Sequence, residues 1–217
     1  MPSTTLEDYL ETIYKLARKG PVRPTPIAEI LGVSGPTVTA TLKRLQTRGL
    51  VTRDNGDVVL TEDGQAAAID IVRKHRISER FLVDVLGLSW DEAHEDACKL
   101  EHALSPRVLS ALELYLDNPA VCPHGHPIPA KDGTITEVEG VPLCDFESGR
   151  CARIVQVEED DEAMLSYLGS LGMFLETEVC VTEVTSPEGL LIVEVNGSTY
   201  ELCREVTEKI LVCSAKK

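Results

Sequence analysis

The chain has few aromatic residues, lacks a long apolar run and contains no CxxC pair among its seven cysteines. Aromatic residues make up 4% of the 217 residues, and no apolar stretch approaches the roughly 18 residues that a membrane-spanning helix needs. The N-terminal residues are polar and acidic rather than basic and apolar, so we expect no secretory signal. Cysteines without disulfide-framework spacing are then expected to be reduced thiols in a cytoplasmic protein.

Positive charge is also scarce, because the formal net charge is −15. The shortage is uneven along the chain. Residues 1–60 hold eight Lys and Arg against six Asp and Glu, whereas residues 61–217 hold thirteen against thirty. The acidic part is expected to repel nucleic acid, whereas the N-terminal part can approach it.

The densest group of metal-binding residue types is the stretch His-Glu-Asp-Ala-Cys-Lys-Leu-Glu-His, residues 94–102. If residues 90–103 form a helix, one face of it carries two imidazoles, a thiol and a carboxylate. These four side chains are His94, Cys98, Glu101 and His102. Such a set suits a first-row transition ion better than Ca²⁺ or Mg²⁺. A solvated face can carry one such residue by chance, but four within nine residues favour a metal site.

The N-terminal part shows the pattern of a winged helix-turn-helix. Helical periodicity over residues 4–19 is followed by short predicted helices at Pro26–Leu31 and Pro36–Arg48, separated by a glycine-containing turn. Two predicted strands, Val51–Arg53 and Val58–Leu60, flank an Asn-Gly pair, which is typical of a β-hairpin. A hairpin directly after the second helix predicts the wing.

The second of the two short helices is the expected DNA-recognition helix. Ala28, Ile30 and Leu31 are expected to pack against Val38, Leu42 and Leu45, which leaves small polar residues at the start of the second helix for DNA. The candidate DNA-contacting residues are Thr25, Ser34, Gly35, Pro36, Thr37, Thr39, Ala40, Thr41, Lys43, Arg44 and Arg48. The three basic residues in this set are the expected phosphate contacts.

The middle of the chain reads as helices with further metal-binding residue types. Helices are predicted over residues 62–88, 90–103 and 106–117, and the last is rich in Val, Leu and Ala, typical of a core or a subunit interface. All five histidines lie between residues 75 and 126. His75 and Glu79 have the i, i+4 spacing of a chelating pair, although an ion pair with a neighbouring basic residue is the commoner role of such a glutamate.

The C-terminal part differs in kind. Residues 127–149, rich in proline and glycine, predict a linker. Residues 150–217 predict about five short strands, one short helix and tight turns, typical of a small SH3-like β-barrel. The expected fold is therefore mainly α with β, in four parts: a winged helix-turn-helix at 1–64, a helical metal-binding and dimerisation domain at 65–126, the linker, and the SH3-like domain.

The blocks EDYLETIY, SGPTVTATLKRL, RKHRISER, HEDACKLEH and CPHGHPIP occur in this order. With them the chain resembles the diphtheria-toxin-repressor family of metal-dependent transcriptional repressors, including its manganese-responsive branch. The resemblance covers nearly the whole chain, and it includes a C-terminal domain of the type found in ferrous-iron transport proteins. It implies a repressor that binds operator DNA as a homodimer, in one or two dimers, when loaded with Mn²⁺ or Fe²⁺.

The resemblance also implies two sets of metal ligands. The primary set comprises Asp8, Cys98, Glu101 and His102, with Glu11 as an additional carboxylate used in manganese-type members. The ancillary set comprises His75, Glu79 and His94, or alternatively Glu79, Cys122 and His124 with Asp160 or Asp161. On local evidence alone, the acidic pair Asp8 and Glu11 fits a solvated first helical turn better than a metal site.

The chain departs from both best-known patterns of the family. Asp8 stands where many iron-type members have Met, and Cys98 stands where manganese-type members usually have Glu. A carboxylate favours Mn²⁺ and a thiolate favours Fe²⁺ or softer ions, with Co²⁺, Ni²⁺ and Zn²⁺ as substitutes. Ala40 replaces the Gln of iron-type members, so their operator sequence does not transfer.

Two other function classes remain open. A metalloenzyme would also use His, Glu and Cys clusters, but the chain shows no general base beyond the ligands and no substrate-pocket motif, so we expect no enzymatic activity. A thiol-based redox regulator on the same DNA-binding scaffold is permitted by seven cysteines.

Overall fold

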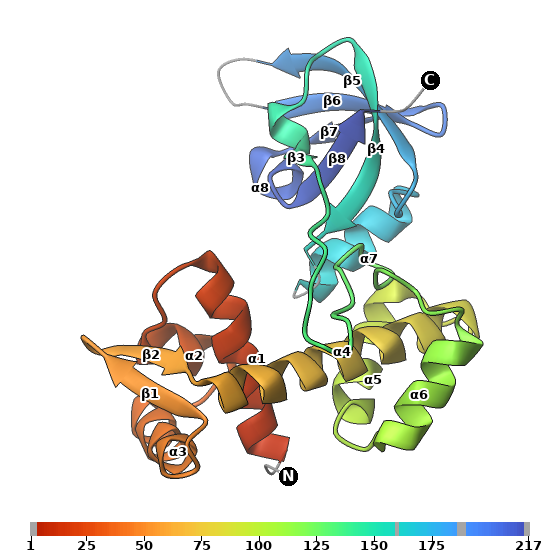
Figure 1. Ribbon diagram of the computed structural model, residues 1–217. Coiled ribbons are helices and arrows are strands. Elements are labelled where there is room, and N and C mark those ends of the chain that lie inside the picture. Colours follow the sequence, from red (N-terminus) through yellow and green to blue (C-terminus); the bar gives the residue numbers. More distant parts are fainter. Residues whose placement is uncertain (1–3, 159–160, 186–189, 215–217) are drawn as a thin grey trace. The chain divides into compact units, whose positions relative to one another are not determined.

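The computed structural model describes residues 4–158, 161–185 and 190–214 (Figure 1). Contacts within the chain divide it into two compact units. Unit 1 comprises Met1–His75, Glu101–Leu104 and Pro129–Thr134; unit 2 comprises Arg76–Leu100, Ser105–Ile128 and Ile135–Lys217. Among the described residues, no helix combines the length and the apolar character that crossing a membrane requires.

Unit 1 is built from short helices and a hairpin. Its elements are α1 (Thr4–Lys19), α2 (Pro24–Ile30), α3 (Gly35–Thr47), β1 (Val51–Asp54), β2 (Asp57–Leu60) and the first part of α4 (Glu62–Asp84). α1 packs against α2 and β2, while α3 packs against α2 and β1. Leu6, Leu10 and Ile13 of α1 are fully buried, because they recur with helical spacing on one face. The predicted winged helix-turn-helix is present (Figure 1).

The start of α3 and the tip of the hairpin follow local rules. The Ser34 hydroxyl caps α3 by accepting a hydrogen bond from the backbone N–H of Thr37. Asn55 and Gly56 both have positive φ, as a two-residue hairpin turn requires. The strands they join pair antiparallel with Val51 opposite Leu60.

Two expected side-chain positions in unit 1 are wrong. Ile30 is 60% exposed, whereas Ile27 is fully buried, so Ile27 supplies the apolar contact expected of Ile30. Thr41 is 5% exposed and therefore lies in the core rather than on a DNA-facing surface. Both errors arise because α2 has only seven residues, too few for periodicity to define which face is buried, and because a threonine is small enough to be buried.

Unit 2 combines helices with a six-stranded antiparallel sheet. After α4 come α5 (Trp90–Leu100), α6 (Pro106–Tyr115), β3 (Val141–Pro142), the 3-10 helix η1 (Leu143–Asp145), β4 (Arg150–Val157), α7 (Glu162–Ser170), β5 (Glu178–Thr185), β6 (Leu190–Val195), β7 (Ser198–Leu202), α8 (Arg204–Thr207) and β8 (Ile210–Ser214). The strand order is β3-β8-β4-β5-β6-β7. Alternate residues of β4, β5 and β6 are buried, which gives the sheet one core face and one solvent face.

The side chain of Trp90 packs α5 against the core of the C-terminal sheet. Its indole belongs to the same buried cluster as Ile154, Leu165 and Val193. The indole Nε1–H donates a hydrogen bond of 2.9 Å to the backbone carbonyl of Leu165 on α7. The helix that carries His94 and Cys98 is therefore anchored on the C-terminal domain.

Three features of unit 2 differ from the expectations. The sheet begins at Val141, inside the stretch predicted as a linker, because Val141 and Pro142 pair with β8 and Leu143 is fully buried. α5 ends at Leu100 rather than continuing to residue 103, since Ser105 caps a new helix that Pro106 begins. A disulfide joins Cys151 and Cys180, so the expectation of seven reduced thiols is wrong. The two cysteines lie 29 residues apart, and only strand pairing makes them neighbours.

Candidate metal centres and DNA-binding face

Unit 1 brings α1 against the residues that follow α5. The Nε2 atom of His102 lies 2.9 Å from a carboxylate oxygen of Asp8 and 3.3 Å from one of Glu101. One ligand atom from each of these residues lies within 4.8 Å of the others. Asp8 and Glu101 are 93 positions apart in the chain, so folding assembles a group that sequence spacing alone does not.

Glu7 is a member of this group that the sequence did not predict. Its carboxylate lies 2.7 Å from Nδ1 of His102, on the other side of the ring from Asp8. Because a carboxylate accepts the Nδ1 proton, this contact favours the tautomer whose Nε2 lone pair faces Asp8 and Glu101. Glu7 stands four residues before Glu11 and so shares its helix face, and this spacing is the sequence signal that could have identified it.

Glu101 takes part in a second group. Its other carboxylate oxygen lies 2.7 Å from Nδ1 of His75, and Glu11, His75 and Glu101 also bring one ligand atom each within 4.8 Å of one another. Both His75 and Glu101 are buried. The resemblance placed His75 with Glu79 and His94, whereas the contact of His75 within unit 1 is with Glu101.

The carboxyl groups of this cluster are poised to accept positive charge. Burial raises the pKa of Glu101, against the opposing effect of the hydrogen bond with His75, and Glu11 raises it further. Burial likewise raises the pKa of Asp8, which His102 lowers and Glu11 raises. Converging carboxylates and imidazoles fit a divalent transition ion, because an ion compensates the repulsion between the carboxylates and accepts lone pairs from the imidazoles.

Unit 2 contains a separate, fully buried group. Glu79, Cys122 and His124 are each 0% exposed and bring one ligand atom each within 4.8 Å of one another. Nδ1 of His124 lies 3.3 Å from the same Glu79 oxygen that lies 3.0 Å from Nδ1 of His94. His124 Nε2 donates to the carbonyl of Trp90 at 3.0 Å, so its Nδ1 is the available ligand atom. A thiol, an imidazole and a carboxylate fit Zn²⁺ or Fe²⁺ chemistry.

The segment that carries Cys122 and His124 is held against β4. The backbone N–H of Val157 donates to the carbonyl of His124 at 2.8 Å, and His126 Nε2 donates to the carbonyl of Val157 at 2.9 Å. Gly125 has φ +87°, and a Cβ there would lie 2.1 Å from the carbonyl oxygen of Val155. Only glycine lets the segment approach the strand so closely.

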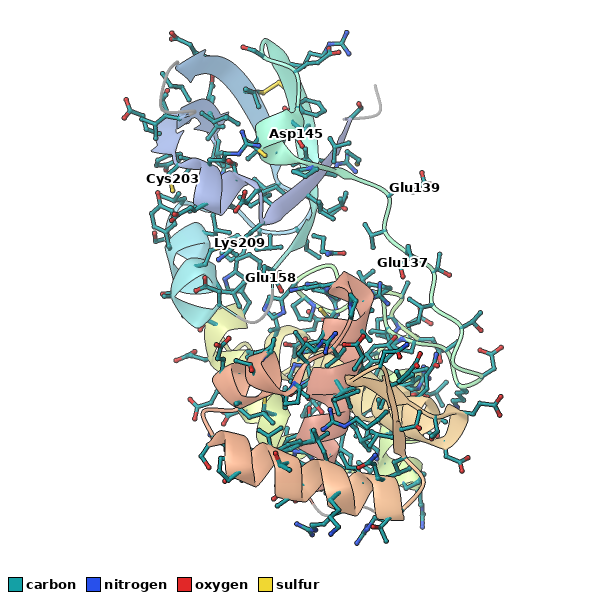
Figure 2. The ribbon with its side chains drawn as sticks, turned by 90° about the vertical axis from the view of Figure 1, so that its left-hand side faces the viewer. Glu137, Glu139, Asp145, Glu158, Cys203 and Lys209 are labelled. Atoms are coloured by element: carbon teal, nitrogen blue, oxygen red, sulfur yellow. A yellow bond between two sulfur atoms is a disulfide. The ribbon has the colours of Figure 1, made fainter. Side chains whose placement is uncertain are left out.

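The remaining predicted ligands are Cys98, Asp161 and Asp160. Cys98 is a half-buried free cysteine on α5, which belongs to unit 2, whereas Asp8 belongs to unit 1. Its role as a ligand beside Asp8 therefore stays a prediction. The Asp161 carboxylate caps α7 by accepting a hydrogen bond from the backbone N–H of Met164, and it lies 2.9 Å from Nζ of Lys209. Figure 2 shows Glu158 beside Lys209. Both oxygens of Asp161 are thus engaged, and the ion pair with Lys209 lowers its pKa. Asp160 lies outside the described residues.

All of the predicted DNA-contacting residues except the buried Thr41 are exposed. Thr25 on α2 and the residues at the start of α3 are exposed, as are the basic residues further along α3. The exposed members are Thr25, Ser34, Gly35, Pro36, Thr37, Thr39, Ala40, Lys43, Arg44 and Arg48. A helix with small residues at its N-terminus and basic residues beyond them suits the major groove and the flanking phosphates.

Sequence models of three protein families match the chain in succession. They are the N-terminal DNA-binding domain of iron-dependent repressors (residues 1–55), the metal-binding and dimerisation domain of iron-dependent repressors (residues 61–130) and the FeoA domain (residues 141–213). The iron-dependent repressor IdeR of Mycobacterium leprae is 39% identical over 208 residues, with 89% of each chain covered. The chain belongs to the diphtheria-toxin-repressor family.

Other members of the diphtheria-toxin-repressor family agree over the full length. The diphtheria toxin repressor of Corynebacterium diphtheriae is 33% identical over 221 residues, with 96% of both chains covered. Among solved structures, a manganese-dependent transcriptional repressor in complex with manganese superposes with a TM-score of 0.87 at 33% identity, covering 97% of this chain and 100% of that one. ScaR with bound Cd²⁺ gives a TM-score of 0.83 at 31% identity, covering 99% and 100%.

Proposed function

We propose that this protein is a metal-dependent transcriptional repressor. Loaded with Mn²⁺ or Fe²⁺, it binds operator DNA as a homodimer and controls genes of metal-ion homeostasis in the cytoplasm. The observation that carries the proposal is the group of Asp8, Glu101 and His102, because Asp8 belongs to the first helix of the DNA-binding part. Its solved and curated relatives are named as iron- or manganese-dependent repressors.

The proposed regulatory ligands fall into a primary and an ancillary set. The primary ligands are Asp8, Glu11, Glu101 and His102, with Cys98 as a further ligand. The ancillary ligands are Glu79, Cys122 and His124. Further candidates are His75 and His94. Of the two neighbouring aspartates we prefer Asp160, because Asp161 already caps α7. An ion in the primary set supplies the positive charge that offsets the repulsion among its carboxylates.

The chain's own residues then link metal binding to DNA binding. Asp8 holds α1 to the residues after α5 only when the repulsion that Glu11 exerts on both Asp8 and Glu101 is offset. Holding these carboxylates together restrains α1. Because α1 packs against α2 and β2, and α2 packs against α3, the recognition helix α3 is restrained as well. A coupling of about 1–3 kcal/mol between the two sites changes operator affinity roughly 5–150-fold, and linkage requires DNA to tighten metal binding equally.

A second copy of the chain is the proposed partner of the exposed apolar surface at the end of α4 and on α6. Val85, Val108 and Tyr115 are 39%, 47% and 70% exposed and border a hollow of about 460 Å³. The matched family domain over residues 61–130 is described as a dimerisation domain. A two-fold dimer presents two copies of α3, whose half-sites in a palindromic operator lie about 34 Å apart.

Fluorescence anisotropy with operator DNA, at fixed salt and without oxygen, tests the proposal. The wild type is expected to bind only with Mn²⁺ or Fe²⁺, and Asp8→Ala or His102→Ala to abolish the metal-dependent binding while the dimer persists in sedimentation. Glu62→Gln, an exposed carboxylate outside both ligand sets, is the control. Full metal dependence in either ligand variant would contradict the proposal, and the mass of the complex distinguishes one dimer per operator from two.

An enzymatic role finds no support in the family, whose relatives are named as repressors. We therefore propose a regulator that has no catalytic activity. A metal-dependent shift of DNA mobility, together with the absence of hydrolytic activity in the loaded protein, distinguishes the two classes.

A further inference from the structure

The solvent face of the C-terminal sheet carries two cysteines opposite each other. Cys151 on β4 and Cys180 on β5 are register partners in the antiparallel ladder, and a disulfide joins them, drawn as a yellow bond in Figure 2. Ala152 and Val179 beside them are fully buried, whereas Cys151 is exposed and Cys180 half-buried. Because side chains alternate between the two faces of a strand, both sulfurs lie on the solvent side.

The packing of the domain does not account for this pair. Cysteine is among the residue types most often buried, and a core cysteine acts as a small apolar side chain. Two cysteines directly opposite each other on the exposed face add nothing to the core formed by Ile154, Val181 and their neighbours. In the part of the chain that the structure describes, neither belongs to the ligand groups around Glu101 or Glu79.

Glu178 adds a carboxylate to the same face. It lies two residues before Cys180 on β5 and is exposed, so it projects to the same side of the strand. Its register partner, Arg153, has its guanidinium 2.9 Å from the carboxylate of Glu176. One ligand atom each from Cys151, Glu178 and Cys180 lies within 4.8 Å of the others.

We propose that Cys151 and Cys180 form a reversible dithiol–disulfide site, which binds a thiophilic divalent ion such as Zn²⁺ together with Glu178 when it is reduced. Two thiolates and one carboxylate supply three of the four ligands that Zn²⁺ takes, and water completes the tetrahedron. Thiolates favour Zn²⁺ over Mn²⁺. The disulfide sulfurs carry no negative charge, so the oxidised pair does not bind the ion.

The redox step is a thiol–disulfide exchange with a low-molecular-weight disulfide, R–S–S–R. The Cys151 thiolate attacks one sulfur of the disulfide, a protein–S–S–R bond forms, and one R–S⁻ leaves. The Cys180 thiolate then attacks the sulfur of Cys151 and releases the second R–S⁻. Two cysteine thiols lose two protons and two electrons, and the small disulfide becomes two thiols. Exposure of Cys151 gives the small molecule access.

This site is independent of the proposed Mn²⁺ or Fe²⁺ ligands. It lies wholly within the C-terminal sheet, and its donor set differs from theirs by having two thiolates. The proposal therefore does not rest on the proposed repressor function. It assigns the C-terminal domain a response to the thiol–disulfide balance and to Zn²⁺.

Thiol trapping tests the redox half of the proposal. The full-length protein is equilibrated in buffers of graded thiol-to-disulfide ratio, alkylated and analysed by peptide mass spectrometry. The linked Cys151–Cys180 peptide is expected to appear in oxidising buffers and to vanish in reducing ones, and Cys180→Ser loses it. Cys203→Ser is the matched control, because Cys203 is an exposed thiol at the start of α8 in the same domain (Figure 2). A link that resists reduction, or never forms, overturns the proposal.

Zinc stoichiometry tests the metal half. Dialysis against Zn²⁺ followed by metal analysis is expected to show about one more ion per chain in the reduced wild type than in reduced Cys180→Ser. Cys203→Ser retains this ion, whereas Glu178→Gln loses it and still forms the disulfide. Oxidation of the wild type removes the same ion. Equal stoichiometry in the reduced wild type and reduced Cys180→Ser overturns the metal site, whatever the DNA affinity of either protein.

Discussion

The Nδ1 atom of His102 lies 2.7 Å from the carboxylate of Glu7, although 95 positions separate the two residues. This contact orients the imidazole so that Nε2 faces Asp8 and Glu101. A carboxylate behind a ligating histidine is a common feature of protein metal sites. Glu7 is therefore a positioning residue for the proposed primary set.

Glu7→Gln is expected to weaken metal binding roughly 10–100-fold, as losses behind a ligating histidine do. The amide is nearly the same size, so the fold should persist and only the histidine's orientation and basicity change. Titration of Mn²⁺ by isothermal calorimetry measures the affinity. Glu62→Gln, an exposed carboxylate on α4, controls for loss of one charge. Unchanged affinity in Glu7→Gln would show that the contact is incidental.

Cys98→Asp is expected to shift metal preference toward Mn²⁺, because a carboxylate replaces the softer thiolate. The measurement is the ratio of Fe²⁺ to Mn²⁺ concentrations that give half-maximal operator binding under anaerobic conditions. Cys203→Ser, which alters an exposed thiol far from α5 in the sequence, is the control. If the ratio stays constant in Cys98→Asp, the thiolate does not ligate the activating ion.

Arg44→Ala is expected to weaken operator binding by a similar factor for all DNA sequences. The side chain is exposed on α3 and is a phosphate contact in the proposed complex. Removing one such contact reduces the slope of log affinity against log salt by about one. Arg150→Ala, an exposed arginine of the C-terminal sheet, should leave the slope unchanged. A sequence-dependent loss would instead identify Arg44 as a base contact.

Gly125→Ala is expected to lower the melting temperature and to weaken the Glu79–Cys122–His124 group. Alanine at positive φ costs about 1–2 kcal/mol, and here its Cβ also meets the Val155 carbonyl. Gly149→Ala is the matched control, since Gly149 has φ +79° but nothing within 4 Å of the added Cβ. Calorimetry should show a clearly larger loss for Gly125→Ala. Equal losses would mean that the segment tolerates a displacement from β4.

Lowering the pH is expected to weaken metal binding already at pH values above the range in which ordinary carboxyl groups titrate. Burial raises the pKa of both Glu101 and Asp8, so protons compete with the ion at a higher pH than the usual carboxyl range. In the metal-free protein the raised pKa values mean that the folded state holds these protons more tightly than the unfolded state, so stability falls as pH rises through them.

The metal-induced rise in melting temperature is therefore expected to be larger near about pH 7.5 than near about pH 5. Asp8→Asn should reduce this pH dependence, because one of the two titrating carboxyls is gone. Thermal scans with and without Mn²⁺ at both pH values measure it. A rise that does not change with pH would show that the buried carboxyls do not hold the ion.

Local patterns predicted the elements of the chain well. Periodicity and turn residues predicted α1, α3 and the Asn55-Gly56 hairpin, because these depend on neighbouring residues only. The disulfide and the contact between Glu7 and His102 depend on pairing across long stretches of chain, which no local rule encodes. The resemblance to a family supplied the ligand sets, and the geometry of the structure supplied the grouping of Glu101 with His75.

Glu101 faces His102 with one carboxylate oxygen and His75 with the other. It is thus common to two candidate ligand groups, one with Asp8 and one with Glu11. Two ions held on either side of one buried carboxylate cannot bind independently, since the first settles the position and charge of a ligand that the second needs. The affinity of either group for its ion therefore depends on whether the other group is occupied, and this dependence is reciprocal.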